Sequence, residues 1–288
     1  MTDVLVIGAG PAALATALSA SAQGLSVRVV GRQRPARQQV ETLHGRVPMW
    51  LQTLHCGDLL SSVSRGTWSS PAGPAHHVLR SEFDAALRQR VLARGVSMLD
   101  EQVAQVLVEG QRPVGVVLAS GETERARWCV DGSGRARVVA RALGLAVRTD
   151  SGPMKAWRGL SDEPGETRFE RTEGGWRFEV PFDGGVAWTE LGAIRPEGAL
   201  AGFDVSWSRV RPCAGRGYLL VGDAAATVDP ASGQGVMTAL WSGCVASAVL
   251  ARIKRQPNME PWLLATYDGW QAERYAERIG PLGAYYAA

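Results

Sequence analysis

The chain has 288 residues, which is enough for one large domain or two small ones and excludes a mini-protein held together by disulfides. Hydrophobic residues make up 45% of it and charged residues 20%, which excludes a disordered or fibrous chain. The net charge of +3 comes from scattered side chains, so the sequence fits small acidic ligands and lacks the clustered basic residues of a nucleic-acid-binding protein.

The four cysteines lie far apart, with no CxxC pair and no histidine at ligand spacing, so we expect buried, reduced thiols and no metal site. The N-terminus enters an apolar run at residues 4–7 without the pattern of a signal peptide, which predicts a cytoplasmic protein. Residues 230–251 are uncharged and long enough to span a membrane. Their serines and glycines predict instead a tight turn followed by a buried helix, and no membrane contact.

In chain order, residues 3–30 predict a strand, a glycine turn, a helix and a second strand, which together form a βαβ unit. Residues 41–60 are predicted to be helical. Residues 64–76 are rich in Ser, Gly and Pro and are predicted to be loop and turn. Apolar residues recur at helical spacing over 81–95, with acidic residues in the first turn, and predict a helix.

The second half of the chain is predicted to be rich in strands. Segments 103–109 and 114–119 predict a strand pair, and Arg127–Val130 predicts a short strand followed by a helix over about 136–143. Four short, turn-rich segments predict an antiparallel sheet: 154–160, 166–171, 175–181 and 185–191. After them we expect a short strand at 217–221, the long uncharged helix and a last amphipathic helix over about 260–279.

The first turn carries the pattern Gly8-x-Gly10-x-x-Ala13 between the predicted strand and helix. Gly8 permits a tight turn, Gly10 lets the backbone approach a pyrophosphate, and Ala13 lets the helix pack closely on the strand. An acidic residue that binds a ribose should end the second strand, but Gly31 and Arg32 stand there. The pattern therefore predicts dinucleotide binding with the adenosine end held differently, Arg32 taking part. A merely structural glycine turn is the alternative.

A second motif begins at Val221-Gly222-Asp223-Ala224-Ala225 and continues as Asp229-Pro230-x-x-Gly233-Gln234-Gly235. Together with the glycine turn, Arg80-x-x-Phe83-Asp84-x-x-Leu87 and Asp131-Gly132-x-Gly134-Arg135, it resembles the glutathione-reductase-type FAD monooxygenases and the related flavin-dependent tryptophan halogenases. The run Glu41-Thr42-Leu43, the DGSGR turn and the C-terminal ERYAERIGPLGAYYA are similar to small flavoproteins that oxidise tryptophan side chains, including those that mature tryptophylquinone amine oxidases.

This resemblance implies an α/β fold with a glutathione-reductase-type, Rossmann-like FAD-binding domain and a reduced antiparallel β substrate layer. It divides the chain into a discontinuous FAD-binding domain (1–144 and 206–255), a substrate-binding β layer (145–205) and a C-terminal helical segment (256–288). The cofactor would be FAD, with Asp223 on its ribityl chain and Arg80 at its side; a helix cap is the alternative for Asp223. The full implied set is Gly8, Gly10, Ala13, Arg32, Arg80, Asp131, Gly132, Asp223, Pro230, Gly233, Gln234 and Gly235.

The resemblance implies FAD-dependent hydroxylation or oxidation of an electron-rich aromatic substrate by a flavin hydroperoxide. The favoured substrate is the indole of a tryptophan, bound to a peptide or carrier or free, and the short chain suggests an open pocket. Electrons would come from NAD(P)H as a transient reductant, since no second glycine motif is present, or from reduced flavin supplied by a partner reductase. A flavin dehydrogenase or reductase and a non-catalytic flavin-binding partner protein are alternatives.

A halogenase is a further alternative. Tryptophan halogenases carry a lysine in the N-terminal third, whereas this chain has none before Lys155. The run Trp176-Arg177-Phe178-Glu179-Val180-Pro181 is nevertheless similar in form to their Trp-x-Trp-x-Ile-Pro motif. The alternation of large apolar residues in this run also predicts the buried face of a strand paired with residues 186–190, which we favour over a direct role.

The candidate acid–base groups are His44, Glu41 and Glu179, with Glu190 and Asp229 as further carboxylates. His44 has an ordinary pKa near neutrality and suits deprotonation of a phenol or indole, with a structural or surface histidine as the alternative. His76 and His77 have no third ligand at metal spacing and predict a strand or loop before Arg80. The aromatic residues near the C-terminus have helical spacing and predict core packing, with a pocket lid as the alternative.

Overall fold

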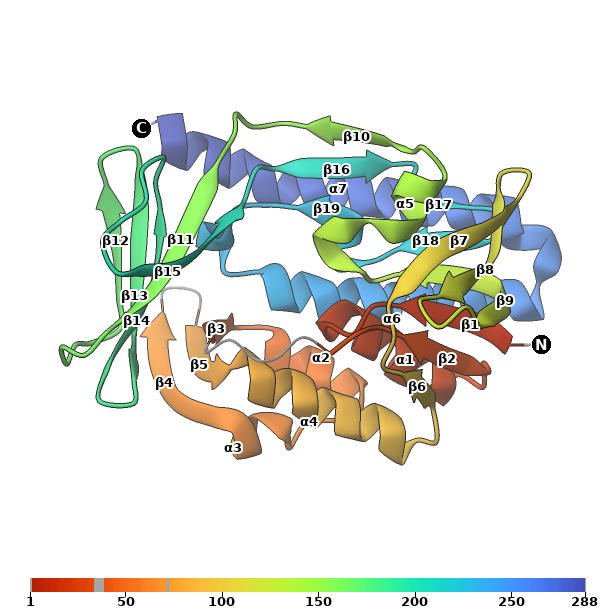
Figure 1. Cartoon of the computed structure of the whole chain (residues 1–288), viewed down its shortest axis with the longest axis horizontal. Helices are drawn as coiled ribbons and strands as arrows, with labels where there is room; N and C mark the ends of the chain where they lie inside the picture. The colour runs from red at the N-terminus through yellow and green to blue at the C-terminus, as the bar shows by residue number, and fades with distance from the viewer. Residues whose placement is uncertain (1, 34–38, 71–72, 288) are drawn as a thin grey trace.

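The computed structural model describes residues 2–33, 39–70 and 73–287 of the chain (Figure 1). Its central sheet has the strand order β17-β18-β9-β1-β2-β6, with β8 added to β9 and β7 paired with β8. The strands of this sheet are β1 (Thr2–Ile7), β2 (Val27–Val30), β6 (Ser97–Leu99), β7 (Val103–Glu109), β8 (Arg112–Leu118), β9 (Thr123–Asp131), β17 (Ala214–Gly215) and β18 (Tyr218–Leu220). Strand β1 pairs in parallel with both β2 and β9, so the predicted Rossmann-like α/β fold is confirmed.

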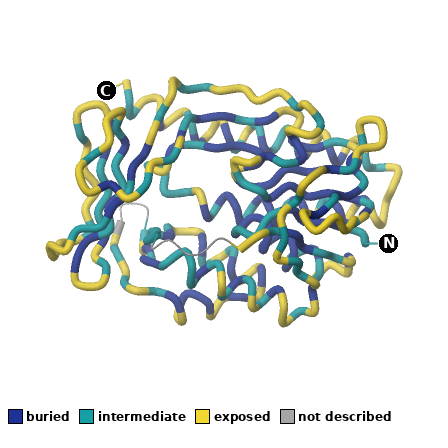
Figure 2. Tube along the Cα trace, viewed as in Figure 1, coloured by how far each residue is buried: buried dark blue, intermediate teal, exposed yellow. Residues whose placement is uncertain are grey.

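Two buried helices, α1 (Pro11–Ala22) and α6 (Gly235–Arg255), pack on each other beside this sheet. A Cβ atom at Gly243 would lie 2.8 Å from the carbonyl oxygen of Ala12, so glycine is needed where the helices meet. By length and composition α6 could cross a membrane, but 61% of its most apolar window is buried inside the protein. Figure 2 shows buried segments concentrated in these helices and the central sheet. The predicted buried helix is confirmed.

The region after β2 corrects two predictions. Residues 41–44, the start of the predicted helix over 41–60, belong to strand β3 (Val40–His44), because they pair with β5 (Gly73–Leu79). The segment 64–76, predicted as loop, contributes β4 (Ser64–Ser70) and the start of β5; backbone pairing between neighbouring strands overrides its turn-rich composition. The helix predicted over 81–95, which follows the β4–β5 strand pair, is confirmed. The helices of this region are α2 (Val47–Thr53), α3 (Leu59–Val63) and α4 (Arg80–Ala93).

The predicted antiparallel sheet is confirmed as a five-stranded sheet of order β12-β13-β14-β11-β15, at the left of Figure 1. Its strands are β11 (Lys155–Ser161), β12 (Arg168–Thr172), β13 (Gly175–Phe182), β14 (Gly185–Leu191) and β15 (Ala199–Asp204). Strands β13 and β14 pair as predicted, with Glu179 opposite Trp188, and both Trp176 and Val180 are buried. The division of the chain into domains stays a prediction.

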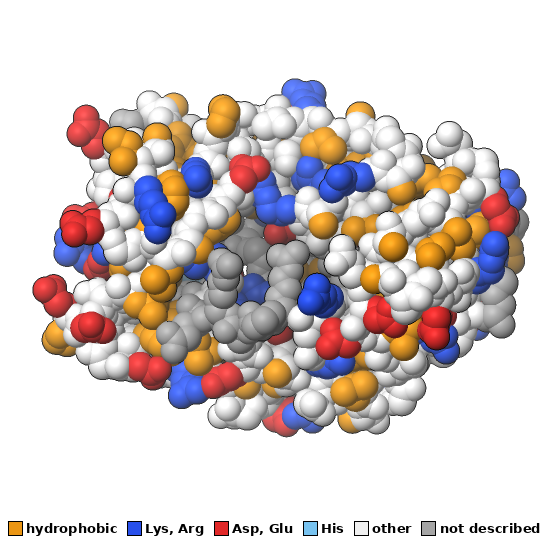
Figure 3. Space-filling model, viewed as in Figure 1, with side chains coloured by type: hydrophobic (Ala, Val, Ile, Leu, Met, Phe, Trp, Pro, Cys, Tyr) orange, Lys and Arg blue, Asp and Glu red, His pale blue; other side chains and the backbone are white. Residues whose placement is uncertain are grey.

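A three-stranded sheet of order β10-β16-β19 lies between the two larger sheets, and short elements complete the chain. These are β10 (Ala146–Thr149), β16 (Ser208–Arg211), β19 (Ala226–Thr227), α5 (Val138–Ala142), η1 (Gly134–Ala136), η2 (Gly222–Ala224), η3 (Pro230–Ser232) and η4 (Pro257–Met259). All four cysteines are free and buried. Acidic and basic side chains are intermingled over the face seen in Figure 3.

The last helix, α7 (Glu260–Ala287), is longer than the predicted span of 260–279. Tyr267 and Tyr275 are buried, and the Tyr267 hydroxyl donates to the carbonyl oxygen of Leu220 at 2.7 Å, so the predicted core packing is confirmed for them. Near the end of the helix, Tyr285 and Tyr286 pack against a buried cluster that includes Trp176 and Leu191 of the five-stranded sheet, which stabilises the extra turns. Its C-terminal end therefore reaches the sheet on which the predicted substrate layer is built (Figure 1).

Candidate functional site

Three sequence motifs meet at one edge of the central sheet. Strand β9 is the parallel neighbour of both β1 and β18, with Asp131 opposite Ile7 and opposite Leu220. The glycine turn after β1, the Asp131 turn after β9 and the segment that holds Asp223 after β18 therefore lie side by side, although Asp223 comes 215 residues after Gly8. The carboxyl edge of a parallel sheet is where α/β proteins bind ligands.

The glycine turn is built on close backbone contacts. A Cβ atom at Gly8, where φ is +125°, would lie 2.3 Å from the carbonyl oxygen of Gly132. A Cβ atom at Gly31 would lie 2.4 Å from the carbonyl carbon of Gly8. Glycine is thus required at both positions, which leaves no room for the expected acidic side chain at position 31. Arg32 lies exposed just beyond, after the end of β2.

Gly10 has a different environment from Gly8. It is the N-cap of α1, no side chain caps the helix, and a Cβ atom at Gly10 would have no atom within 4 Å. The N-terminus of α1 therefore has no capping side chain and has open space beside Gly10, which leaves room for a phosphate group. Gly132 packs against Ala13, since a Cβ at Gly132 would lie 3.0 Å from the Ala13 Cβ. These residues fit the pyrophosphate of a dinucleotide.

Asp223 also lies on this edge. Part of its side chain is exposed to solvent, and protein surrounds the rest. Burial raises the pKa of its carboxyl, and the positive charges of Arg135, Arg278 and Arg80 oppose that rise. Within the described ranges, no hydrogen bond to the carboxylate is found, and the short helix η2, whose N-cap is Val221, has no side-chain cap. A carboxylate that is left without a hydrogen-bond donor fits a hydroxyl-bearing ligand such as the ribityl chain of FAD.

The loop over 229–235 leads into helix α6 and forms the part of the candidate site next to that helix. The Asp229 carboxylate accepts from the Ala231 N–H at 2.8 Å, and Gly233 takes a φ of +61°. Helix α6 then begins at Gly235 without a side-chain cap, and a Cβ at Gly235 would have no atom within 4 Å. Free N–H groups and the positive end of the helix dipole therefore point into open space, which suits a ligand group that gains negative charge.

Asp131, in contrast, serves the protein itself. One carboxylate oxygen accepts from the Ser133 N–H at 3.0 Å and from its hydroxyl at 2.6 Å, and the other accepts from the Val139 N–H at 2.8 Å. Asp131 is fully buried and holds the start of α5 in place. Asp131 therefore shapes the turn that follows β9, and both of its carboxylate oxygens are used within the protein.

Arg80 is held by two carboxylates. It donates to Glu41 at 3.1 Å and to the two oxygens of Asp84 at 3.0 and 3.2 Å. Burial acts to lower the pKa of Arg80, but the charges of Glu41 and Asp84 outweigh it and raise the pKa above its ordinary value. Glu41, a candidate base, is therefore an ion-pair partner in the structure. The arginine is therefore fixed in place by its two partners.

His44 borders the loop over 229–235. A Cβ at Gly233 would lie 2.6 Å from the Cδ2 atom of His44, so the imidazole lies directly against the Gly233 backbone. Burial lowers the pKa of His44, which favours the neutral form that can accept a proton. Glu179 is not brought near it: it alternates with Trp176 and Phe178 along β13 and pairs with Arg177 at 2.8 Å.

A row of aromatic side chains extends from His44 to the five-stranded sheet. The His44 ring meets Trp68 edge to face with a centroid distance of 5.9 Å, and Trp68 contacts Phe178 at 5.8 Å. Phe178 is followed by Phe169 at 6.3 Å. We call these four residues the aromatic row. Trp68 and Phe169 were missed by sequence reasoning, because Trp68 lies in a segment predicted as loop and Phe169 shows its contacts only in the folded sheet.

His77 lies beneath this row and is satisfied at both ring nitrogens. Its Nδ1 is 2.9 Å from the Thr42 hydroxyl and its Nε2 is 2.9 Å from the Thr167 hydroxyl. Burial, together with the positive charges that His44 and His76 can carry, lowers the pKa of His77 to about 4. His77 is therefore neutral at physiological pH, and its position in β5 confirms the predicted strand before Arg80.

Acid should destabilise the protein through His77. The unfolded chain binds a proton at this residue below about pH 6.5, whereas the folded chain does so only near pH 4. The stabilising contribution is complete above about pH 6.5 and is lost as the pH falls towards 4. Lowering the pH from about 7 to about 4.5 should reduce the free energy of unfolding of both proteins. We expect this reduction to be about 2 kcal/mol smaller in His77→Asn than in the wild type.

Chemical denaturation at several pH values measures this difference. His76→Asn is the matched control, because His76 is the neighbouring histidine on the opposite face of β5 and lies against Ser64. It should keep most of the acid sensitivity of the wild type, because burial and not the charge of His76 is the largest cause of the lowered pKa of His77. The same pH dependence in His77→Asn and in the wild type would contradict the assignment.

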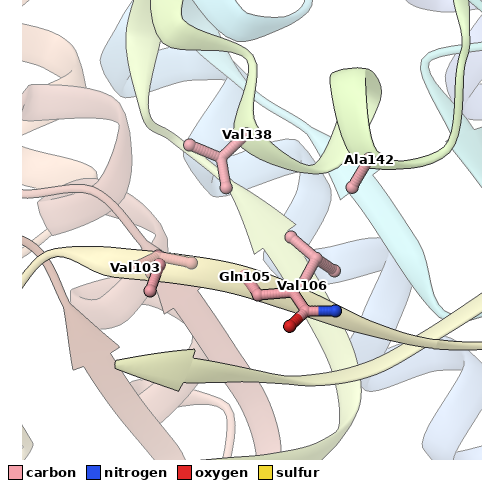
Figure 4. Close-up of a pocket in the computed structure, with 6 residues that line it drawn as sticks. Val103, Gln105, Val106, Val138 and Ala142 are labelled. Atoms are coloured by element: carbon pink, nitrogen blue, oxygen red, sulfur yellow. The ribbon is translucent and has the colours of Figure 1, made fainter. Parts of the chain in front are cut away.

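A cavity of about 340 Å³ lies between β7 and α5. Figure 4 shows Val138 and Ala142 facing Val103, Gln105 and Val106 across it. Its side chains are aliphatic apart from one amide and bring no acid, base or charged group, so we assign it no chemistry. In the described ranges, the His, Cys, Asp and Glu side chains form no group of three or more that could hold a metal ion.

Comparison with known proteins matches residues 3–155 to the family described as lycopene cyclase protein. Digeranylgeranylglycerophospholipid reductase 1 of Methanopyrus kandleri is 25% identical, over 94% of this chain and 86% of its own length. The flavin-dependent brominase Bmp2 superposes with a TM-score of 0.81 at 18% identity, over 94% of this chain and 83% of the brominase chain. The peptidyl tryptophan dihydroxylase QhpG, essential for tryptophylquinone cofactor biogenesis, superposes with a TM-score of 0.80 at 23% identity, over 96% of this chain and 73% of its own.

Proposed function

The chain belongs to the lycopene cyclase protein family and has the fold of FAD-dependent enzymes, and from this premise we propose that it is an FAD-dependent monooxygenase that oxidises an electron-rich aromatic substrate. The proposed substrate is the indole of a tryptophan, bound to a peptide or carrier or free. FAD is the cofactor that the glycine turn, Asp223 and the N-terminus of α6 fit. A cytoplasmic location is part of the proposal.

The aromatic row is the observation that carries this proposal. It starts at the loop over 229–235, where His44 lies against Gly233, and continues through Trp68 and Phe178 to the five-stranded sheet. Aromatic side chains at centroid distances near 6 Å can extend the same edge-to-face and offset contacts to an aromatic ligand. An indole placed on this row would lie between the cofactor loop and the substrate sheet.

In the proposed reaction FAD, when bound, supplies the activation of dioxygen with two electrons from NAD(P)H or from a partner reductase. One oxygen atom enters the aromatic ring and the other leaves as water. The neutral His44 accepts the proton that the ring releases, while Trp68 and Phe178 orient the ring and keep water away. The N-terminus of α6 stabilises negative charge on the group that lies over the loop.

The positions of the lysines favour a monooxygenase over a halogenase that depends on a lysine. The sequence contains only Lys155 and Lys254. Lys254 donates to Asp3 at 2.8 Å and lies 19 residues beyond Gly235 in α6, which is about 28 Å along the helix axis. The Lys155 ammonium lies over the Trp157 ring, 4.1 Å from its centroid. Both lysines are thus engaged with partners outside the aromatic row.

A flavin-dependent reductase is the second candidate, and one observation favours it. The reductase of Methanopyrus kandleri matches 94% of this chain, and its name describes reduction of an isoprenoid lipid. A reductase would add two electrons and two protons to a carbon–carbon double bond without consuming dioxygen. Oxygen uptake therefore distinguishes it from the proposed monooxygenase.

The test begins with an absorbance spectrum of the purified protein with and without added FAD. The bound flavin is then reduced by NADPH under air, alone and in the presence of indoles or tryptophan-containing peptides. A monooxygenase should consume oxygen in step with NADPH and add oxygen atoms to the substrate mass. Substrate-dependent NADPH oxidation without oxygen uptake would contradict the proposal and support the reductase, while bromide-dependent product mass would support the halogenase.

A further inference from the structure

Asp229 is a fully buried carboxylate at the start of the loop over 229–235. Besides the Ala231 N–H, it accepts hydrogen bonds from two side chains of distant segments. The indole Nε1 of Trp176 in β13 donates to its Oδ1 at 3.1 Å, and the hydroxyl of Tyr286 in α7 donates to its Oδ2. Trp176 Nε1 also lies 3.0 Å from the Tyr286 hydroxyl oxygen. The three side chains therefore form a closed hydrogen-bonded group.

The three members of this group belong to three parts of the molecule. Trp176 lies in the five-stranded sheet, Tyr286 in the last turns of α7, and Asp229 at the start of the loop that leads into α6. Figure 1 shows the C-terminal end of α7 beside this sheet. Burial raises the pKa of Asp229, and the hydrogen bonds from Tyr286, Ala231 and Trp176 act against that rise by favouring the charged carboxylate.

We propose that Asp229, Trp176 and Tyr286 are positioning residues that fix the loop over 229–235, so that the end of α7 controls how the cofactor is held. The inference rests on the proposed function, because it takes that loop as the one that faces FAD. The C-terminal helix, for which the sequence predicts core packing or a pocket lid, thereby gains a role in holding the cofactor loop.

The loop is short, and its two ends are held in different ways. At its start, the Asp229 carboxylate bonds the Ala231 N–H at 2.8 Å and so sets the direction in which the chain enters the turn. At its far end, Gly233 takes its positive φ against the His44 ring. Loss of the Tyr286 hydroxyl leaves one oxygen of a buried carboxylate without a donor that the structure describes, a costly state that rotation of Asp229 would relieve. That rotation would break the bond to Ala231 and loosen the turn.

Tyr286→Phe tests the inference, and Tyr285→Phe is its matched control. Tyr285 is the preceding residue of the same helix, and its hydroxyl finds no hydrogen-bond partner among the described residues. We expect Tyr286→Phe to weaken FAD affinity about tenfold, since a buried hydrogen bond to a charged group is lost, and to change the shape of the flavin's visible absorbance band. Tyr285→Phe should stay within about twofold of the wild type with an unchanged band.

Two further variants complete the experiment. Trp176→Phe combined with Tyr286→Phe should weaken FAD affinity no further than the more affected single variant, because both act through Asp229. If Tyr286→Phe fails to fold, Asp229→Asn replaces it; it keeps an acceptor for Ala231 but removes the oxygen that accepts from Tyr286, and should alter the visible band in the same direction.

The possible outcomes separate this inference from the proposed function. Failure of the wild type to bind FAD would refute the cofactor assignment itself. If the wild type binds FAD and Tyr286→Phe matches Tyr285→Phe in both affinity and absorbance band, the inference is overturned, even where the thermal stability of Tyr286→Phe is lower. The absorbance band is decisive, since a purely structural role would lower stability without altering the surroundings of the bound flavin.

Discussion

The Asp223→Ala variant is expected to purify without FAD, with an affinity for added FAD at least about 100-fold below that of the wild type. The carboxylate lies at the carboxyl edge of the central sheet and has no hydrogen-bond donor within the described ranges. A ribityl hydroxyl would supply that donor. A hydrogen bond to a charged, partly buried group contributes about 1.5–3 kcal/mol, and the remaining loss comes from the misplaced cofactor.

Flavin content after purification and fluorescence titration of the apoprotein measure this loss. His44→Ala is the control within the site, because the imidazole lies against the loop backbone and is assigned to proton transfer. It should retain FAD and lose turnover with the aromatic substrate. Asp223→Asn, which keeps the shape of the side chain but not its charge, should bind FAD with intermediate affinity. Equal flavin content in the wild type and in Asp223→Ala would defeat the cofactor assignment.

A matched pair of glycine variants gives the second large effect. Gly10→Val should fold as the wild type does, because a Cβ at Gly10 meets no atom within 4 Å and the residue has an extended backbone with φ −90° and ψ 179°. The valine side chain would then occupy the space in front of the first-turn N–H groups of α1. We expect FAD affinity to fall at least about 100-fold, since a pyrophosphate could no longer reach these groups.

Gly8→Val should fail for a different reason. Its Cβ would lie 2.3 Å from the carbonyl oxygen of Gly132, and its φ of +125° is unfavourable for any residue with a side chain. We expect the free energy of unfolding to fall by about 3 kcal/mol or more, with or without FAD. Thermal unfolding of the apoprotein separates the two variants. Retention of FAD by Gly10→Val, or wild-type stability of Gly8→Val, would contradict the geometry of the turn.

The candidate site was predictable wherever a short stretch of sequence carried the whole feature. Gly8, Gly10 and Ala13 stand in one turn, and Asp223 stands in one short run, so each could be recognised without knowing its neighbours in space. The same reasoning assigned Asp131 to the cofactor, whereas the structure shows its oxygens occupied by Ser133 and Val139. A carboxylate in a turn looks alike in sequence whether it binds a ligand or the backbone.

Features made by distant segments could not be predicted. The aromatic row joins His44, Trp68 and Phe178 from three strands, and the hydrogen bond from Trp176 to Tyr286 spans 110 residues. The wrong predictions for the segments that form β3, β4 and β5 have the same cause. Residues 40–44, 64–70 and 73–76 are polar or turn-rich, and they become strands because each finds a backbone partner in the neighbouring strand.

The sequence by itself determined the βαβ unit, the antiparallel character of the region around β13, the buried α6 and the glycine turn that starts α1. These depend on local periodicity and on the conformational freedom of glycine, which act over a few residues. Only the tertiary structure decided that the glycine turn and Asp223 follow neighbouring strands of one sheet, and that the end of α7 bonds the loop over 229–235 through Asp229. Pairing and side-chain hydrogen bonds between remote segments form only when the chain folds, because they depend on which strands become neighbours.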